Sequence, residues 1–507
     1  MRPQWVERCD KVQKINSEAT NVKATLNQRH AGVLLHITSL PSRDLGQDAY
    51  RFIDFLHEVG ASVWQVLPLG ITHEDGSPYQ SLSAHAGNPA LICFKSLVAQ
   101  GWLTTDVYCE TCQGMDTFRC TCLLLKAFAG FQERATAAEQ YDFSRFCATN
   151  QFWLDDFALF RVLRKKFDHQ SWNEWPENFK NRHLAALNDV RFFLKTPLEA
   201  VKFEQYIFFK QWTALKTYAN ERGILLFGDM PIFVSYDSAD VWANRKVFKL
   251  TPEGEMSVVA GVPPDYFSET GQRWGNPHYN WTHLQATGFN WWLQRMQTQA
   301  ALFDVVRIDH FRGLEAAWEI PADEPTAIKG EWVKAAGEPL LTAICAEFSE
   351  VALVAEDLGI ITPEVDALRT KFNLSGMKIM QFAFSGDADN PYLPENHELS
   401  SVVYTGTHDN DTTLGWVEKL TPEERAYVCK ILEIDDTNIA PALMQCALAS
   451  IANLAILPMQ DILDLDSSHR MNIPGTTVGN WQWRFQWKQL SAEKVSRLAK
   501  WIKESNR

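Results

Sequence analysis

The segment Phe303-Asp304-Val305-Val306-Arg307-Ile308 is short and consists mainly of apolar and β-branched residues. Such a composition is typical of a parallel strand that is covered on both faces. Seven further runs of this kind occur along the chain, at residues 32–37, 63–67, 224–228, 351–355, 377–384, 401–405 and 454–458. The sequence therefore predicts eight buried parallel strands.

Helical patterns occupy the segments between these runs. Apolar side chains repeat at helical spacing over residues 52–59, and Gly60 follows as a helix-ending residue. Thr362-Pro363 and the Thr-Pro-Glu-Glu stretch at 421–424 carry the capping signals of helix starts. Helices that alternate with eight parallel strands predict an α/β protein with a (β/α)8 TIM barrel, because right-handed crossovers allow the sheet to close.

The spacing of the runs also predicts how the chain is divided. Residues 1–30 are expected to form an N-terminal extension, and residues 31–507 the catalytic barrel. Two gaps are too long for ordinary barrel connections. We expect a mostly helical inserted subdomain at 90–220, between strands two and three. The gap at 235–302, between strands three and four, is rich in Gly, Pro and aromatic residues and is expected to form lid loops and helices over a substrate.

Composition narrows the class of partner. The 48 basic and 62 acidic side chains give a net charge of −14, which disfavours binding to nucleic acid or to an anionic membrane. The 19 Trp and 30 Phe residues suit sugars, because flat apolar rings stack on sugar faces. The first thirty residues lack the apolar core of a signal peptide, and the apolar runs are too short to span a bilayer. We therefore expect a cytoplasmic protein.

Four of the ten cysteines are closely spaced. Cys109, Cys112, Cys120 and Cys122 form a C-x2-C pair followed by a C-x-C pair, so a small zinc site is one interpretation. The second pair runs directly into a helical stretch at 123–128, which favours the alternative of free thiols. No metal and no cofactor is expected.

Acidic residues follow several of the predicted strands. Asp229, Asp309 and Glu356 come directly after their runs, and Asp409 lies four residues after another run. Any one of them alone is equally well explained as a helix N-cap. The carboxyl ends of barrel strands meet at one rim, however, so these four carboxyl groups are expected to lie close together. Their mutual repulsion would raise their pKa values, as is common at catalytic sites.

An acidic cluster with aromatic neighbours suits two chemistries. One is binding of a divalent metal through oxygen ligands, and the other is glycoside cleavage by two carboxyl groups. Arg307 lies two residues before Asp309, so both side chains should point to the same side of the strand. The guanidinium group would keep the carboxyl group ionised, as a nucleophile requires, and would repel a metal ion. The sequence therefore favours glycoside cleavage.

The same segments resemble a known family. Val-Arg-Ile-Asp-His-Phe-Arg-Gly at 306–313, Val-Ala-Glu-Asp-Leu-Gly at 354–359 and Thr-His-Asp-Asn at 407–410 are similar to the signature strands of the 4-α-glucanotransferases. These enzymes are also called amylomaltases or disproportionating enzymes, and they form glycoside hydrolase family 77. The resemblance covers nearly the whole chain after about residue 30, through motifs at 77–80, 228–232, 261–268, 271–277 and 479–481. The related α-amylases carry Asn-His at the end of strand three, where this chain has Asp229-Met230-Pro231-Ile232.

The resemblance implies roles for individual residues. Asp309 is similar to the family nucleophile, Glu356 to the general acid/base, and Asp409 to a third acid that holds sugar hydroxyls and helps to raise the pKa of Glu356. Further residues are implied to bind the glucan or to form its lid. These are Arg307, His408, Asp229, Tyr79, Ser77, Tyr266, Phe267, Trp274 and Asn480.

The activity implied is transfer of an α-1,4-glucan segment to the 4-hydroxyl of an acceptor glucan or glucose. It would proceed with retention through a covalent glycosyl-aspartate, which requires carboxyl groups about 5 Å apart. The alternatives are an α-glucan hydrolase, a debranching-type transferase and a catalytically inactive maltodextrin-binding protein. The partner expected is a maltooligosaccharide, amylose or a glycogen-derived dextrin, and the expected assembly is a monomer or weak homodimer.

Some aromatic and histidine residues are assigned to packing. His36 and His57 are interpreted as structural, whereas His85 and His310 lie near the rim and are left open between structure and binding. Trp172 and Trp175 in the expected insertion are interpreted as core residues.

Overall fold

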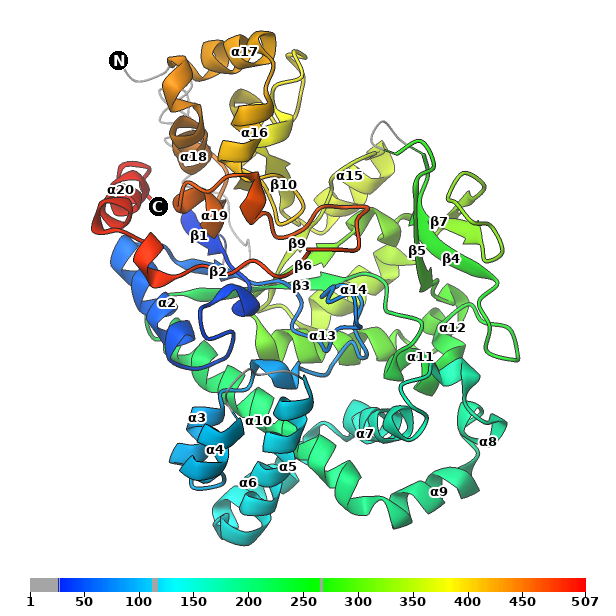
Figure 1. Cartoon of the computed structure of the whole chain (residues 1–507). Helices are drawn as coiled ribbons and strands as arrows, with labels where there is room; N and C mark the ends of the chain where they lie inside the picture. Colours follow the sequence, from blue (N-terminus) through cyan, green and yellow to red (C-terminus); the bar gives the residue numbers. More distant parts are fainter. Residues whose placement is uncertain (1–25, 27, 112–116, 265–267) are drawn as a thin grey trace.

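The computed structural model describes residues 26, 28–111, 117–264 and 268–507. Its centre is a ring of eight parallel strands in the spatial order β10-β11-β12-β1-β2-β3-β6-β9, surrounded by helices (Figure 1). The strands are β1 (His30–Leu34), β2 (Val63–Gln65), β3 (Leu225–Pro231), β6 (Val305–Asp309), β9 (Ala352–Ala355), β10 (Gly376–Ile379), β11 (Ser401–Tyr404) and β12 (Leu454–Pro458). All eight predicted strands are present, and the prediction of a TIM barrel is confirmed.

The ring is closed between β9 and β10 by much less pairing than its other strands share. A single parallel bridge joins Val354 to Ser375, and the Ala355 N–H donates to the Ser375 carbonyl over 2.8 Å. The Asp357 carboxylate reinforces this junction, because it accepts the Met377 backbone N–H over 2.7 Å and lies 3.3 Å from the Arg369 guanidinium. We call this junction the β9–β10 seam.

The sixth predicted strand is shorter in the structure than in the sequence analysis. The run at 377–384 forms a strand only to Ile379, and Met380–Phe382 then makes a 3-10 turn. The turn brings the Gln381 side chain to the loop after β11, where its amide donates to the Asp411 carbonyl over 2.8 Å. The apolar residues at the end of the run therefore belong to the rim of the barrel.

Three of the helices that cover the barrel begin or end at the residues that the sequence predicts. α2 (Gln47–Val59) ends at Gly60, whose φ of 81° suits glycine. α15 (Pro363–Lys371) follows Thr362, and α17 (Pro422–Leu432) begins with a complete capping box. The others are α13 (Asn290–Leu302), α14 (Gly337–Glu347), α16 (Thr413–Lys419), α18 (Ile439–Ala449), α19 (Met459–Ile462) and α20 (Ala492–Glu504). Within the described residues, no helix has both the length and the apolar character that a membrane span requires.

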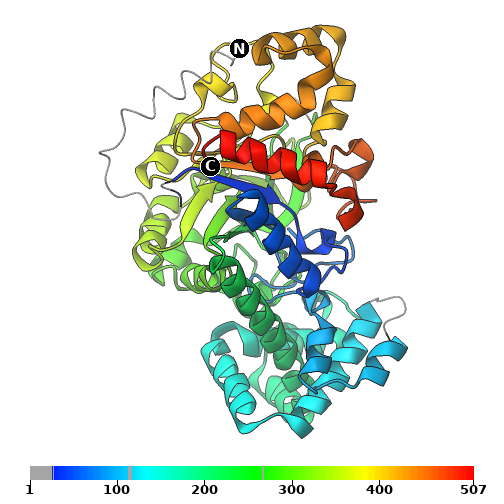
Figure 2. The same ribbon diagram turned by 90° about the vertical axis from the view of Figure 1, so that its left-hand side faces the viewer.

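A group of helices fills the first long gap and gathers at one end of the molecule (Figures 1 and 2). They are α3 (Phe94–Ala99), α4 (Thr105–Thr111), α5 (Thr117–Arg134), α6 (Ala137–Thr149), α7 (Gln151–Lys166), α8 (Glu177–Lys180), α9 (Leu184–Phe193) and α10 (Lys195–Asn220). Trp172 and Trp175 are buried among them, as expected of core residues. The division of the chain into domains stays a prediction.

A second sheet, which the sequence analysis did not predict, flanks the open end of the barrel. It is antiparallel, in the order β5-β4-β7-β8. Its strands are β4 (Val258–Val262), β5 (Gln272–Pro277), β7 (Ala316–Pro321) and β8 (Glu331–Lys334). The gap expected to hold loops and helices thus contributes two strands besides α11 (Ala239–Ala243), α12 (Trp281–Ala286) and α13.

Candidate active site

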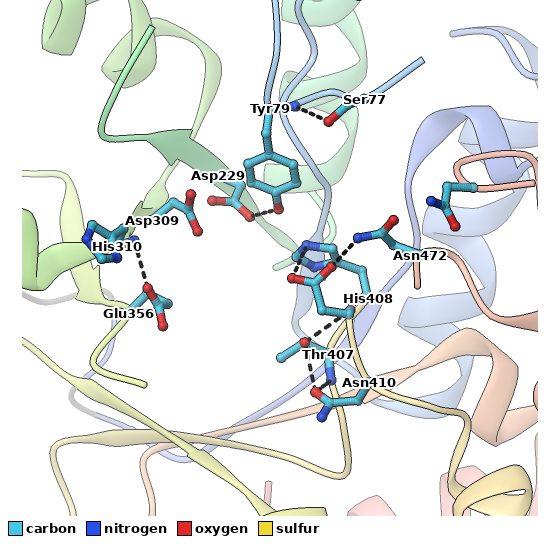
Figure 3. A network of polar contacts seen from close by, with 12 residues as sticks. Ser77, Tyr79, Asp229, Asp309, His310, Glu356, Thr407, His408, Asn410 and Asn472 are labelled. Atoms are coloured by element: carbon cyan, nitrogen blue, oxygen red, sulfur yellow. Dashed lines mark hydrogen bonds and ion pairs between the residues drawn. The ribbon is translucent and has the colours of Figure 1, made fainter. Parts of the chain in front are cut away.

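Four acidic side chains come to the carboxyl ends of the barrel strands. Asp229 lies on β3 and Asp309 ends β6, while Glu356 follows β9 and Asp409 lies in the loop after β11. In Figure 3, Asp229, Asp309 and Glu356 lie on one side of the polar cluster, and His408 lies on the other. The prediction that the four strand ends meet at one rim is confirmed by the barrel.

Arg307 is the cation that holds two of these acids. The register of β3 and β6 places it opposite Asp229, and its Nη1 lies 2.8 Å from Asp229 Oδ1 and 2.9 Å from Asp309 Oδ1. The Arg307 residue is only 5% exposed, so these ion pairs are little screened by water. Because Asp309 is two positions further along the strand, both side chains point to one side, as predicted.

Asp309 and Glu356 are two interacting, partly buried carboxyl groups. Burial raises the pKa of both, and neighbouring carboxylates raise both further. The positive charge of Arg307 acts in the opposite direction on both groups, but its direct contact is with Asp309. The backbone N–H groups of Leu358 and His310 also oppose the shift in the pKa of Glu356.

Backbone N–H groups fix the position of Glu356. The His310 N–H donates to Oε2 over 2.7 Å, and the Leu358 N–H donates to Oε1 over 3.1 Å. His310 has a φ of 52°, a left-handed conformation that is uncommon for a residue other than glycine. That conformation turns its N–H toward the acid. His310, left open by the sequence, thus contacts a candidate catalytic group through its backbone.

Asp409 is held by a segment distant in sequence. The Asn472 side-chain amide donates to Asp409 Oδ1 over 2.6 Å, and the Arg470 guanidinium donates to the Asp409 carbonyl over 2.8 Å. The other carboxylate oxygen of Asp409, Oδ2, lies 3.3 Å from His408 Nε2. The sequence analysis missed Asn472 and Arg470, because no motif or spacing links them to a loop about sixty residues earlier.

Tyr79 connects the two sides of the cluster. Its hydroxyl donates to Asp229 Oδ2 over 2.8 Å, and its ring stacks on His408 with centroids 5.2 Å apart and planes within 13° (Figure 3). Ser77 shapes the same loop, because its hydroxyl oxygen accepts the Tyr79 backbone N–H over 3.4 Å. The structure therefore brings Asp229, Tyr79 and His408 together, with Ser77 next to them.

The remaining expected glucan contacts are less central. Trp274 packs edge-on against His310, with centroids 4.8 Å apart, and so lies beside the Glu356 side of the cluster. The Asn480 amide bonds within its own loop, to the Ile473 N–H and the Thr476 carbonyl. Tyr266 and Phe267 lie outside the described residues.

The possible zinc ligands are separate from this site. Cys120 is buried, its thiol donates to the Pro89 carbonyl over 3.6 Å, and burial raises its pKa to about 12. Such a thiol is a poor metal ligand, because the ligand must be deprotonated. The Cys109 side chain and Cys112 lie outside the described residues. In the parts of the chain that the structure describes, no three metal-ligating side chains gather at one point.

Comparison with known proteins identifies the family of this chain. The family model for 4-alpha-glucanotransferase matches residues 35–490. A 4-alpha-glucanotransferase of Thermus thermophilus is 47% identical over 93% of this chain and 97% of the relative, and a chloroplastic/amyloplastic one of Solanum tuberosum is 44% identical over 90% and 82%. The solved amylomaltase of Streptococcus agalactiae in complex with acarbose is 37% identical, covers 95% of this chain and all of its own, and has a TM-score of 0.91. The chain belongs to the 4-alpha-glucanotransferase family.

Proposed function

We propose that the protein transfers segments of α-1,4-glucan by a retaining double displacement on Asp309. The observation that carries the proposal is the ion pair between Asp309 and the buried Arg307, with Glu356 at the end of the neighbouring strand β9. Because Arg307 contacts Asp309 directly, the negative charge belongs on Asp309 and the proton on Glu356. One group is then a nucleophile and the other an acid, as the chemistry requires.

The reaction follows from these two protonation states. The Asp309 carboxylate attacks the anomeric carbon while Glu356 gives its proton to the glycosidic oxygen, and the bond between that carbon and that oxygen breaks. The reducing-end fragment leaves, and the remaining glucan is an ester of Asp309. Glu356, now ionised, takes the proton of an acceptor 4-hydroxyl, whose oxygen attacks the same carbon and releases Asp309. Two inversions give retention.

The surrounding polar groups are assigned to binding of the sugar at the point of cleavage. Asp409 is held by Asn472 and His408 through its two oxygens and still has lone pairs that can accept sugar hydroxyls. Asp229 is similarly shared by Arg307 and Tyr79. Because their partners fix them in advance, these carboxylates lose little freedom when a sugar binds.

Transfer must also be faster than hydrolysis. Water is present at about 55 M, so an acceptor sugar competes only if it is oriented, and well-oriented groups reach effective molarities of about 10⁵ M or more. Trp274 lies beside the Glu356 side of the cluster, where the acceptor would enter. We assign Trp274, with Tyr266 and Phe267, to stacking on the acceptor and exclusion of water.

Maltotriose tests the proposal. The wild-type enzyme should yield glucose together with chains longer than maltotriose. Glucose and maltose alone would indicate a hydrolase, and no new products would indicate a sugar-binding protein. Asp309→Asn should abolish transfer while calorimetry still detects maltooligosaccharide binding, and the exposed Asp389→Asn should behave as wild type. Retained turnover in Asp309→Asn would remove the assignment of the nucleophile.

Three expectations from the sequence accompany this proposal. The preferred partners are neutral α-1,4-glucans rather than polyanions, in keeping with the net charge of −14. The cytoplasmic location and the monomeric or weakly dimeric state are part of the proposal as well. Sedimentation of the purified protein would test the oligomeric state.

A further inference from the structure

A small cavity lies behind His408, on the side of the barrel formed by β1, β11 and β12. Its walls include His36 and Ser39 after β1, Asp461 after β12, and Arg470 and Trp483 from the C-terminal segment, besides His408 itself. The space open to the centre of a water-sized sphere is about 20 Å³. This volume suffices for one ordered water molecule.

Two buried polar atoms of this wall have no hydrogen-bond partner among the described residues. They are the Nδ1 atom of His36 and the Nε1 atom of Trp483. The His36 residue is only 8% exposed, and the nearby Ser39 hydroxyl makes only a long contact of 3.8 Å with the Met471 sulfur. Buried polar atoms are nearly always paired, so these atoms indicate a small polar ligand in the cavity.

His408 is a third nitrogen-bearing side chain of this wall, besides His36 and Trp483. His408 uses its Nε2 toward Asp409, at 3.3 Å, and stacks on Tyr79 with its ring face. No hydrogen bond from the described part of the chain reaches His408 Nδ1. Because His408 lines the cavity, Nδ1 is the nitrogen available to a ligand bound there.

We propose that this cavity binds one water molecule that joins His36 and Trp483 to His408 and fixes the proton of His408 on Nε2. The chemistry of the indole sets the direction of each hydrogen bond. The Trp483 N–H is only a donor, so the water oxygen accepts it. The two water protons are then donated to His36 Nδ1 and His408 Nδ1, which must both be bare. Each histidine therefore carries its proton on Nε2.

Burial and the neighbouring charged groups act on the pKa of His408 in opposite directions. Asp409 on its own loop and Asp229 on β3 favour the protonated ring, whereas burial and Arg307 on β6 oppose it and lower the pKa of His408. His36 on β1 stays neutral, because burial lowers its pKa to about 3. The other charged groups of the wall have partners: Asp461 accepts from Thr405 and Thr413, Asp411 accepts from Ser467 and pairs with Lys419, and Arg470 donates to the Asp409 carbonyl.

The role for His36 is that of a positioning residue. A neutral His408 gives one hydrogen bond to Asp409 and leaves the charge of that carboxylate available to sugar hydroxyls, a consequence that rests on the proposed function. The sequence analysis interpreted His36 as structural. The structure assigns it a further task, because it determines through the water which nitrogen of His408 holds the proton.

Spectroscopy of the ring nitrogens tests the water bridge without measuring activity. The protein is labelled with ¹⁵N-histidine, and the His408 signals among the 13 histidines are identified from their loss in His408→Gln. The wild type should show a bare Nδ1 and a protonated Nε2 in His408. His36→Leu removes one acceptor and fills the cavity, so the water should be lost, both tautomers of His408 should appear and its ring-nitrogen signals should shift. Trp483→Phe, which removes only the indole donor, should shift the same signals.

His397 provides the matched control. It is also a buried neutral histidine, but it bonds to Ser450 and the Tyr392 carbonyl away from the site. His397→Leu should lower the melting temperature without changing the His408 signals. If transfer is measured in parallel, the pH profile of kcat/KM should change in His36→Leu and stay as in the wild type in His397→Leu. Unchanged His408 signals in a folded His36→Leu, or in Trp483→Phe if His36→Leu does not fold, would overturn the water bridge and leave the proposed function untouched.

Discussion

At the scale of single residues, Arg307 sets the charge state of the site. It is buried and contacts two carboxylates at once, so it offsets part of the repulsion among the acids. It does this asymmetrically, because Asp309 is in contact with it while Glu356 receives only backbone N–H groups. A single strand therefore carries both the proposed nucleophile and the cation that favours its ionised form.

Removal of that cation should change the pH dependence of the reaction. Arg307→Leu leaves burial and like charges to raise the pKa of Asp309 further. The nucleophile must be ionised, so kcat/KM should rise with pH through a higher pKa than in the wild type. Activity at neutral pH should fall about 100-fold or more, the effect of breaking a buried ion pair.

A pH–rate profile for maltotriose transfer measures this effect. Arg307→Lys keeps the charge and is the control, and its acidic limb should lie closer to that of the wild type. An acidic limb at the same pH in all three proteins, with the fold intact by circular dichroism, would show that Arg307 does not control the ionisation of Asp309.

Replacement of Asn472 should lower kcat/KM, although no sequence motif marks this residue. It donates to Asp409 over 2.6 Å, and hydrogen bonds to charged groups contribute about 1.5–3 kcal/mol. Asn472→Ala should therefore lower kcat/KM about 10- to 100-fold, mainly through KM, because a misplaced Asp409 binds the sugar less well. Asn438→Ala, at an exposed asparagine that also bonds to an aspartate, should leave kcat/KM within about twofold of wild type.

Residues of the site could be predicted where position on a strand determines them. Asp309 and Glu356 follow buried runs, and the two-residue period of a strand places Arg307 beside Asp309. Asn472 and His36 could not be predicted, because their partners lie on other segments and no local pattern encodes those contacts. Their roles depend on closure of the whole barrel.

At the scale of elements, strands with their own apolar run were predictable and strands that depend on partners were not. β12 matches its predicted bounds, because Leu454–Pro458 is apolar throughout. β5, with the sequence Gln-Arg-Trp-Gly-Asn-Pro, contains glycine, proline and polar residues and is a strand only because β4 pairs with it. The second sheet is therefore a product of tertiary pairing.

Helix α10 carries a buried acid whose replacement should stabilise the protein. Glu204 is 7% exposed, and burial raises its pKa, with Arg161 and Lys165 opposing the shift. A carboxyl group with a raised folded-state pKa destabilises the fold increasingly as the pH rises above its unfolded-state pKa. Glu204→Gln should thus raise the melting temperature at pH 7, by about 2 °C.

The sign of the pH dependence distinguishes this cause from better packing. The gain in Glu204→Gln should shrink as the pH falls toward 4, where the wild-type carboxyl group is protonated in both states. Differential scanning calorimetry at pH 4 and pH 7 measures it. Glu221→Gln, at an exposed position after the same helix, serves as the control, and a gain of equal size at both pH values would contradict the electrostatic explanation.

At the scale of the whole molecule, the helices of the first long gap support the loop that carries Tyr79. The Gln205 side chain of α10 both donates to and accepts from the Gly87 backbone, over 2.9 Å in each case, and Gln211 does the same for Cys93. Any side chain at Gly87 would collide with Phe208 of the same helix. The barrel itself was predictable from eight runs, whereas this attachment depends on contacts about 120 residues apart.

The β9–β10 seam should be the first part of the ring to open. It has one bridge, whereas β6 and β9 pair over four positions. Hydrogen exchange should therefore be faster at the amides of Ala355 and Met377, which donate across the seam, than at the amides between β3 and β6. Asp357→Asn should increase that difference, because it weakens the acceptor for Met377. Equal protection around the ring would contradict this prediction.

The seam lies directly beside Glu356, and this position has a consequence for the ratio of hydrolysis to transfer. Opening there leaves Glu356 attached to β6, because the His310 N–H holds its carboxyl group and its own N–H donates to the Ile308 carbonyl. It gives bulk solvent a path to the Glu356 side of the site, so that water competes with the acceptor sugar for the glycosyl ester. We therefore expect the yield of short reducing sugars to rise on warming at temperatures well below the melting transition. The ratio of hydrolysis to transfer should thus increase before the protein unfolds.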